Sequence, residues 1–103
     1  SNKPGAVHGA VTAGAYEPAG GVPVFLEAYD EVTHKRVVDL RSTRTDMAGQ
    51  YNFAGLAPGV YRLVSTFEYQ SPLIGDIDAM RPRVFKVEEG RDQQQDLDVY
   101  VIR

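Results

Sequence analysis

The chain lacks cysteine and tryptophan, and only two of its 103 residues are histidines. Without cysteine it can form no disulfide scaffold and carry no thiol chemistry, and two histidines alone are too few for a structural zinc site. Long apolar runs are missing as well. The stretch Val22–Leu26 is interrupted by Glu27, whereas a membrane-spanning helix needs about 20 apolar residues. We therefore expect no direct membrane insertion.

Positive charge is also scarce. Eleven lysines and arginines stand against fourteen acidic residues, which gives a net charge of −3 and a pI near 5.2 and argues against nucleic acid as a partner. What remains, 43% hydrophobic residues in a length typical of one domain, predicts a single globular unit without a cofactor. We expect residues 1–4 to be a cloning remnant and leader, and residues 5–103 to be that domain.

Short segments of alternating apolar and polar residues, rich in Val, Tyr, Phe and Thr, recur between Gly, Pro and Asp. No segment sustains a helical period. The sequence predicts an all-β fold, a seven-stranded β-sandwich. The predicted strands are residues 5–12, 22–30, 36–45, 50–54, 60–69, 83–88 and 95–102.

The alternation also predicts which side chains face the core. In the second predicted strand Val24 and Leu26 face inward, whereas Phe25, Glu27 and Tyr29 face outward on a side that Glu27 marks as wetter. In the fifth strand Tyr61, Leu63, Ser65 and Phe67 face inward and Val64 outward. In the last strand Leu97, Val99 and Val101 face inward.

Two turns carry strong local signals. Asp46 can accept the backbone N–H two residues further on, and Gly49 can adopt the positive φ that closes the hairpin. Pro58 and Gly59 fit the central positions of a type II turn, and Tyr61 follows as a corner tyrosine whose hydroxyl bonds back to the backbone. We interpret all five residues as structural.

The strings Thr45-Asp46-Met47-Ala48-Gly49-Gln50-Tyr51-Asn52-Phe53 and Leu56-Ala57-Pro58-Gly59-Val60-Tyr61, after Gly9-Ala10-Val11 and Gly21-Val22-Pro23-Val24, resemble the carboxypeptidase regulatory-like domain. That family belongs to the transthyretin-like, prealbumin-type Greek-key β-sandwiches. The resemblance covers nearly the whole chain, but its motifs are turn chemistry and so indicate fold better than function.

The resemblance implies a non-catalytic accessory module of a larger exported bacterial protein, located outside the cell, in the periplasm or at the outer membrane. Its partner would be a neighbouring domain of the parent protein or another protein. We expect a monomer or a weak homodimer, since exposed edge strands permit pairing. The alternative is a carbohydrate-binding module that stacks polysaccharide on Phe25 and Tyr29.

Enzymes and crosslinked domains of related fold provide contrasts. Transthyretin-like hydroxyisourate hydrolases use several histidines, an arginine and a C-terminal Tyr-Arg-Gly-Ser tail, whereas this sequence ends Val99-Tyr100-Val101-Ile102-Arg103. Intradiol dioxygenases bind iron with two histidines and two tyrosines, but His8 and His34 have no suitably spaced tyrosine pair. Collagen-adhesin B-type repeats form a Lys–Asn isopeptide bond, and the segment 96–103 contains no asparagine. We expect neither enzymatic activity nor an isopeptide crosslink.

The outward-facing apolar residues form a candidate contact patch of Phe25, Tyr29, Val64, Leu73 and Ile74, unless a loop folds over them. Leu73 and Ile74 belong to the segment 70–82, which lacks alternation and is too long for a hairpin. It is either a partner contact or a plug in one open end of the sandwich, with Ile77 as part of the plug. Asp76 and Asp78 alternate as calcium ligands can, but no EF-hand pattern surrounds them.

Overall fold

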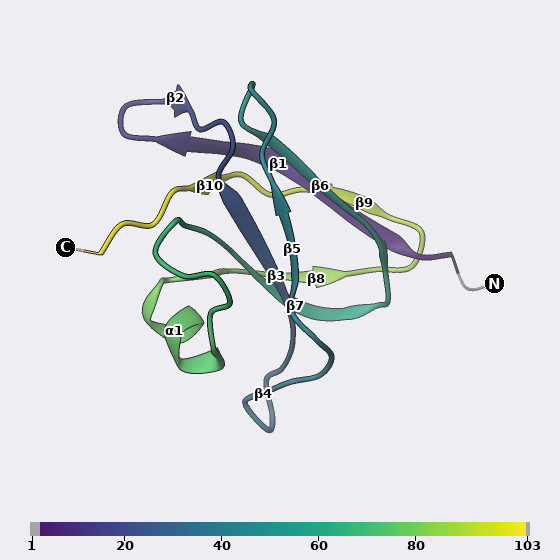
Figure 1. The fold of residues 1–103 in the computed structure, drawn as a ribbon. Helices are drawn as coiled ribbons and strands as arrows, with labels where there is room; N and C mark the ends of the chain where they lie inside the picture. The colour runs from purple at the N-terminus through teal and green to yellow at the C-terminus, as the bar shows by residue number, and fades with distance from the viewer. Residues whose placement is uncertain (1–2, 103) are drawn as a thin grey trace.

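A computed structural model describes residues 3–102, so the predicted remnant at residues 1–4 lies partly outside the described residues. The described chain forms an all-β sandwich of two sheets, as the sequence predicts (Figure 1). In chain order the elements are β1 Gly5–Ala13, β2 Glu17–Pro18, β3 Pro23–Asp30, β4 Lys35–Arg36, β5 Arg41–Arg44, β6 Gln50–Leu56, β7 Gly59–Ser65, α1 Ile74–Ala79, β8 Arg83–Val87, β9 Asp92–Gln94 and β10 Leu97–Asp98.

The first sheet is built around β1. This strand pairs antiparallel with β6, which places Val7 opposite Phe53 and Gly9 opposite Tyr51. Its other edge pairs in parallel with β9 and then β10, so the end of the chain lies along its beginning. The short β2 folds back onto the last residues of β1.

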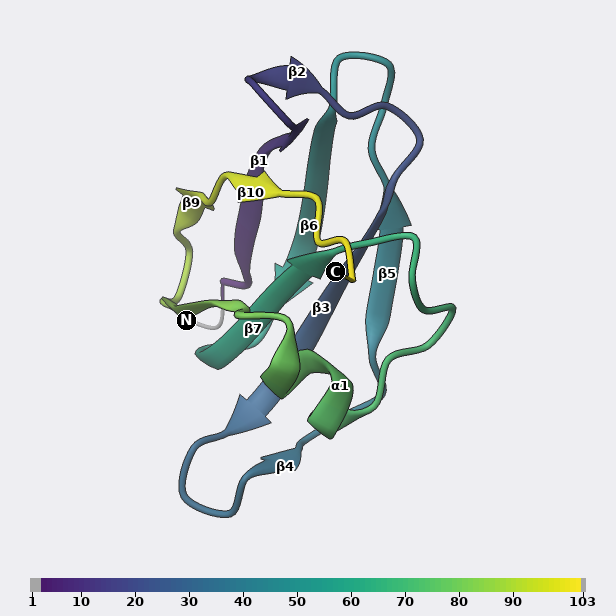
Figure 2. The same ribbon diagram turned by 90° about the vertical axis from the view of Figure 1, so that its left-hand side faces the viewer.

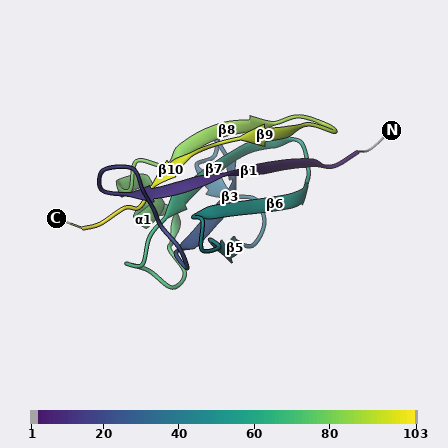
Figure 3. The same cartoon turned by 90° about the horizontal axis from the view of Figure 1, so that it is seen from above.

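The second sheet is built around β3 and β7, which pair antiparallel with Leu26 opposite Leu63. The other edge of β3 pairs with β5 and β4, and the other edge of β7 pairs with β8. The second and fifth predicted strands therefore share a sheet. Viewed from above, the strands β9, β1 and β6 overlap the strands β8, β7 and β3 of the second sheet (Figure 3).

The core fills the space between the sheets, where alternate residues of each strand point inward. The inward faces predicted for β3 and the start of β7 are confirmed. The members of this core are Val7, Val11, Ala19, Val22, Val24, Leu26, Tyr51, Phe53, Leu56, Tyr61, Leu63, Phe85, Val87 and Leu97.

The bounds of the observed strands differ from the predicted ones, and β1 and β6 are slightly longer than predicted. The strand predicted at 36–45 is interrupted between β4 and β5. Of the strand predicted at 95–102 only β10 is observed, and β9 before it was not predicted. The prediction was also wrong for Phe67 and Val101, which are 63% and 55% exposed instead of facing the core. The strand β7 ends at Ser65, opposite Val24 near the start of β3, so alternation stops there.

The segment 70–82 contains the helix α1, which the sequence did not predict. Figure 2 shows α1 beside β3 and β7, on the side of the second sheet that faces away from the first. There Ile77 and Met80 pack on Phe25 and Val64. The plug interpretation was therefore wrong in its location, because the segment covers an outer sheet face. With α1 six residues long, the described part of the chain has no helix that could cross a membrane.

The turn chemistry predicted at Asp46, Gly49 and Tyr61 is present, whereas the type II turn predicted at Pro58 and Gly59 is not. Asp46 Oδ1 accepts the N–H groups of Ala48 and Gln50, both at 2.9 Å, and Gly49 has a φ of 78°. The hydroxyl of Tyr61 donates to the carbonyl of Ala57 at 2.7 Å, as expected of a corner tyrosine. Gly59 follows Pro58 at a φ of 150°, positive but not the value near 80° of a type II turn.

Candidate functional site

The predicted contact patch is divided by α1. Phe25 and Val64 are only 3% and 4% exposed, because Ile77 and Met80 cover them. The expectation that these two side chains face solvent was wrong. Ile74 and Tyr29 are half-buried, and Leu73 alone of the five is largely exposed. These residues therefore form no continuous apolar surface.

Beside this small core lies a buried ionic cluster. Glu27 is 0% exposed, and its two carboxylate oxygens accept hydrogen bonds from Arg62 Nε at 2.6 Å and Arg36 Nε at 3.0 Å. Arg62 also donates to Asp78 Oδ1 on α1 at 2.5 Å. Glu27 therefore does not mark a wet face as predicted; it is buried because two arginines neutralise it.

The cluster fixes the segment that contains α1 to the sheet. Arg36 Nη2 donates to the carbonyl of Pro72 at 2.7 Å, before the helix, while Asp78 anchors the helix itself. Asp76 accepts the N–H of Leu73 at 2.9 Å. The two carboxylates considered as calcium ligands therefore have roles in the fold, one in an ion pair and one at the helix start.

The guanidinium of Arg62 also covers the ring of Tyr29, 3.8 Å from its centroid. Burial alone would lower the pKa of Arg62, but hydrogen bonds to Glu27 and Asp78 outweigh it and raise the pKa. Arg62 remains a cation over the aromatic face. Tyr29 cannot offer that face to a sugar, and Phe25 is buried, so neither residue forms the stacking platform considered above.

The two histidines lie apart. Nδ1 of His8, on β1, is 2.9 Å from Oδ1 of Asp92, and Nδ1 of His34, in the β3–β4 turn, is 2.9 Å from the hydroxyl of Tyr29. Ser65 donates its hydroxyl to the carbonyl of Pro23 at 2.9 Å. None of these contacts joins a nucleophile to a base and an orienting group, the arrangement that covalent catalysis requires.

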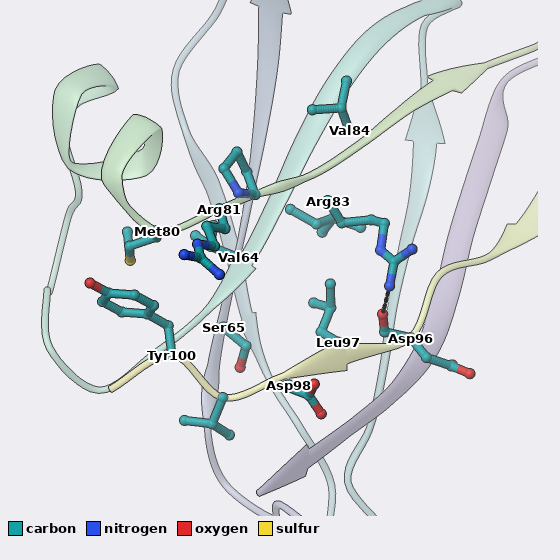
Figure 4. A pocket seen from close by; sticks show the side chains of 13 residues that line it. Val64, Ser65, Met80, Arg81, Arg83, Val84, Asp96, Leu97, Asp98 and Tyr100 are labelled. Atoms are coloured by element: carbon teal, nitrogen blue, oxygen red, sulfur yellow. Dashed lines mark hydrogen bonds between the residues drawn. The ribbon is translucent and has the colours of Figure 1, made fainter. Parts of the chain in front are cut away.

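A groove of about 510 Å³ lies where the two sheets diverge (Figure 4). We call it the seam groove. Its floor is the end of β7, residues 63–65. One wall is formed by residues 80–84, from the end of α1 to the start of β8, and the other by residues 96–100 around β10.

Side chains bridge the seam beside the groove. Arg83 Nη2 donates to the carbonyl of Asp96 at 3.1 Å, the bond dashed in Figure 4, and Gln93 Nε2 donates to the carbonyl of Lys86. At the other end of the groove, the N–H of Tyr100 donates to the carbonyl of Ser65 at 2.8 Å. Between these contacts the edges of β8 and β10 face the groove without pairing with each other.

The charged side chains of the groove differ in whether they already have partners within the domain. Asp96 Oδ1 accepts the N–H of Ala10 at 3.0 Å, and this bond, with one from Gln94, lowers the pKa of Asp96. Asp98 Oδ1 accepts the hydroxyl of Thr12 at 2.7 Å. Arg81 points into the groove near Tyr100 and Ser65 (Figure 4), and no described residue forms an ion pair with it.

Sequence reasoning missed this groove. The residue pattern gave no role to Arg81. The available signal was the segment 70–82, whose apolar residues and lack of alternation predicted a contact of some kind. The groove itself depends on the parallel pairing of β10 with β1, which no local pattern indicates.

No protein-family model matches the chain, and the curated proteins include no match. Among solved structures it is similar to the major pilin SpaD of Corynebacterium diphtheriae (13% identity, TM-score 0.65, covering 95% of this chain and 30% of that one) and to the major pilin subunit BcpA of Bacillus cereus (17%, 0.63, 93% and 29%). It is also similar to PA1324 of Pseudomonas aeruginosa, described as a candidate carbohydrate-binding protein. The identity is 15% and the TM-score 0.54, and the match covers 94% of this chain and 89% of that one.

At these identities the similarity establishes the β-sandwich fold alone. The chain spans 17 to 47% of the first five solved chains that it matches, so each of those proteins contains much more than this domain.

Proposed function

We propose that this chain is a non-catalytic contact module of an exported bacterial protein, a β-sandwich that joins neighbouring domains or binds another protein. The carboxypeptidase regulatory-like family remains our interpretation of its turn motifs. The similarity to single domains of pilins supports this placement among multidomain surface proteins.

The observation that carries the proposal is the position of the two ends of the chain. The molecule measures 40 × 27 × 19 Å, and the chain enters at one end of it and leaves at the opposite end (Figures 1 and 3). A domain of this form can be linked in a row, with one neighbour at each end, without reversing the direction of the chain.

Both ends carry groups suited to contact. At the end where the chain leaves, Tyr16 is 92% exposed in the β1–β2 turn. At the end where the chain enters, Lys3, Pro4, Leu56, Pro58 and Glu89 line a hollow of about 350 Å³. An exposed tyrosine is an amphipathic contact residue that loses little conformational entropy on binding.

Hydrogen exchange tests the proposal. The full reading frame that contains this domain is compared with the isolated domain, residue by residue, under the same conditions. We expect added protection in the full-length protein around Tyr16, at the hollow by Pro58 or along the seam groove. Identical exchange throughout the domain in both contexts contradicts a contact role.

A further inference from the structure

The seam groove has an unpaired backbone edge. The N–H of Gln95 donates to the carbonyl of His8, and that of Val99 donates to Thr12, so alternate residues of this segment face β1. The intervening residue Asp98 therefore directs its N–H toward the groove. A strand edge with an open donor is a ready site for adding an extended peptide.

The groove also holds a cation in a strained position. Arg81 follows Met80, the last residue of the α1 cap, with a φ of 51°. Glycine is the usual residue there, since a left-handed backbone brings the Cβ of any other residue too close to the following carbonyl oxygen. Strained residues of this kind cluster at binding sites, where the strain fixes a side chain in place.

At one point of the groove, Arg81 favours an anionic group on the occupant. The two carboxylates of the groove, Asp96 and Asp98, already accept hydrogen bonds from β1, whereas Arg81 has no ion-pair partner among residues 3–102. Arginine matches a carboxylate in two-point geometry. Val84 and Val99 provide apolar surface along the same walls.

We propose that the seam groove binds an extended peptide segment of a partner that lies along the edge of β10 and places an acidic side chain on Arg81. The peptide accepts a hydrogen bond from the N–H of Asp98, its carboxylate pairs with the guanidinium of Arg81, and its apolar side chains contact Val84 and Val99. This inference rests on the proposed contact function and names the partner's chemistry.

A phage-displayed library of random heptapeptides, selected on the purified domain, tests the inference. We expect the enriched peptides to share an aspartate or glutamate at one position among β-forming residues. In fluorescence polarisation, replacing that acid by its amide should weaken binding about tenfold, the loss of one charge-assisted hydrogen-bonded pair. Amide chemical shifts should change at Ser65, Asp98 and Tyr100.

The critical variant is Arg81→Gly, which removes the guanidinium and relaxes the left-handed backbone, so loss of binding cannot be attributed to unfolding. This variant should bind the acidic peptide about tenfold more weakly than the wild type does. Its affinity for the amide peptide should be unchanged, as a direct pair between the acid and Arg81 requires. Arg91→Gln is the matched control, because Arg91 is an exposed arginine in the turn before β9, outside the groove. It should bind both peptides like the wild type.

Each of the following results overturns the inference: a library without enrichment, enriched peptides that lack a common acid, or equal affinity of the acidic peptide for Arg81→Gly and wild type. The proposed function fails separately. If hydrogen exchange reveals protection at the ends of the domain while the library yields nothing at the groove, the contact role stands and the peptide site is wrong. If the enriched peptides change the chemical shifts only of amides outside the groove, the peptide site is likewise wrong.

Discussion

Glu27 illustrates how a single residue can reverse the character of a sheet face. A glutamate on an outward strand position normally indicates solvent, but this one is fully buried between Arg62 and Arg36. Burial of a carboxylate is costly unless it is paired and hydrogen-bonded, and both of its oxygens are. The outer face of β3 and β7 is thereby made a second, partly ionic core under α1.

Breaking this cluster should be far more harmful than replacing it. Arg62→Met leaves Glu27 buried without its shorter ion pair and should lower the free energy of unfolding by about 3–5 kcal/mol. The double variant Glu27→Met with Arg62→Met should recover most of that loss, since Arg36 and Asp78 can turn to solvent. Urea denaturation midpoints measure both.

Arg91→Met is the control for the loss of an arginine, because its pair with Glu88 at 3.6 Å lies at the surface. Its denaturation midpoint should match that of the wild type. A double variant that is as unstable as Arg62→Met alone would contradict the account of the cluster as an exchangeable buried pair.

The lowered pKa of Asp96 implies that part of the free energy of unfolding depends on pH in the acid range. Hydrogen bonds from Ala10 and Gln94 hold its folded pKa below the ordinary 3.8, so the unfolded chain takes up the proton first as pH falls. The stabilisation is complete above about pH 4 and is lost as pH falls through the lowered pKa. Asp96→Asn should therefore be less stable than wild type at neutral pH, with the difference shrinking below pH 4. Thermal unfolding from pH 2.5 to 7 checks this, and a constant difference would contradict it.

At the scale of elements, Gly9 and Gly75 differ in the space that a Cβ atom would find. A Cβ on Gly9 of β1 would lie 2.0 Å from the carbonyl oxygen of Gln95, so only glycine allows the end of the chain to approach β1 this closely. A Cβ on Gly75 of α1 meets no atom within 4 Å, and its φ is not positive.

Gly9→Ala should therefore destabilise the domain by about 1–3 kcal/mol or more and loosen β9 and β10 from β1. Gly75→Ala should stabilise it by up to about 1 kcal/mol, because alanine favours the helix. Denaturation curves measure the sign of the change in the free energy of unfolding for each variant. Hydrogen exchange should locate the effect of Gly9→Ala at residues 92–99. A neutral Gly9→Ala would contradict the close packing of the terminal strand.

Some elements could be predicted because their signals are local. Asp46 and Gly49 specify a hairpin within five residues, and the alternation around Leu26 and Leu63 assigns the core face of β3 and β7. The helix α1 could not be predicted, since six residues are too few to display a helical period. Burial of Phe25 follows from that helix, which reaches β3 only in the folded chain.

The seam groove escaped prediction for a similar reason. Its walls come from the start of β8 and from β10, and they face each other only because the last strand runs parallel to the first. Arg81 carries no sequence signal, because an arginine beside a proline suggests a solvated loop. Its significance depends on a left-handed backbone and on the hydrogen bonds that already occupy Asp96 and Asp98.

At the scale of the whole molecule, the groups that stabilise the fold differ from the surfaces for which we propose contacts. The hydrophobic core, the turns and the ionic cluster under α1 hold the sandwich together without a disulfide. The two ends of the chain and the seam groove remain open to neighbours. This division agrees with the contact function that we propose, since the contacts of such a module can vary without altering its core.

Site-specific photocrosslinking in the full-length protein tests the central claim most directly. p-Benzoylphenylalanine replaces Val84, which is 51% exposed on the groove wall, or Val32, which is 89% exposed in the β3–β4 turn away from the groove. After irradiation in the producing cells, mass spectrometry identifies the linked segments. We predict that the probe at position 84 captures an extended acidic segment of a neighbouring domain or protein, and that the probe at position 32 captures none. No crosslink at 84, or equal yields at both positions, would contradict the account.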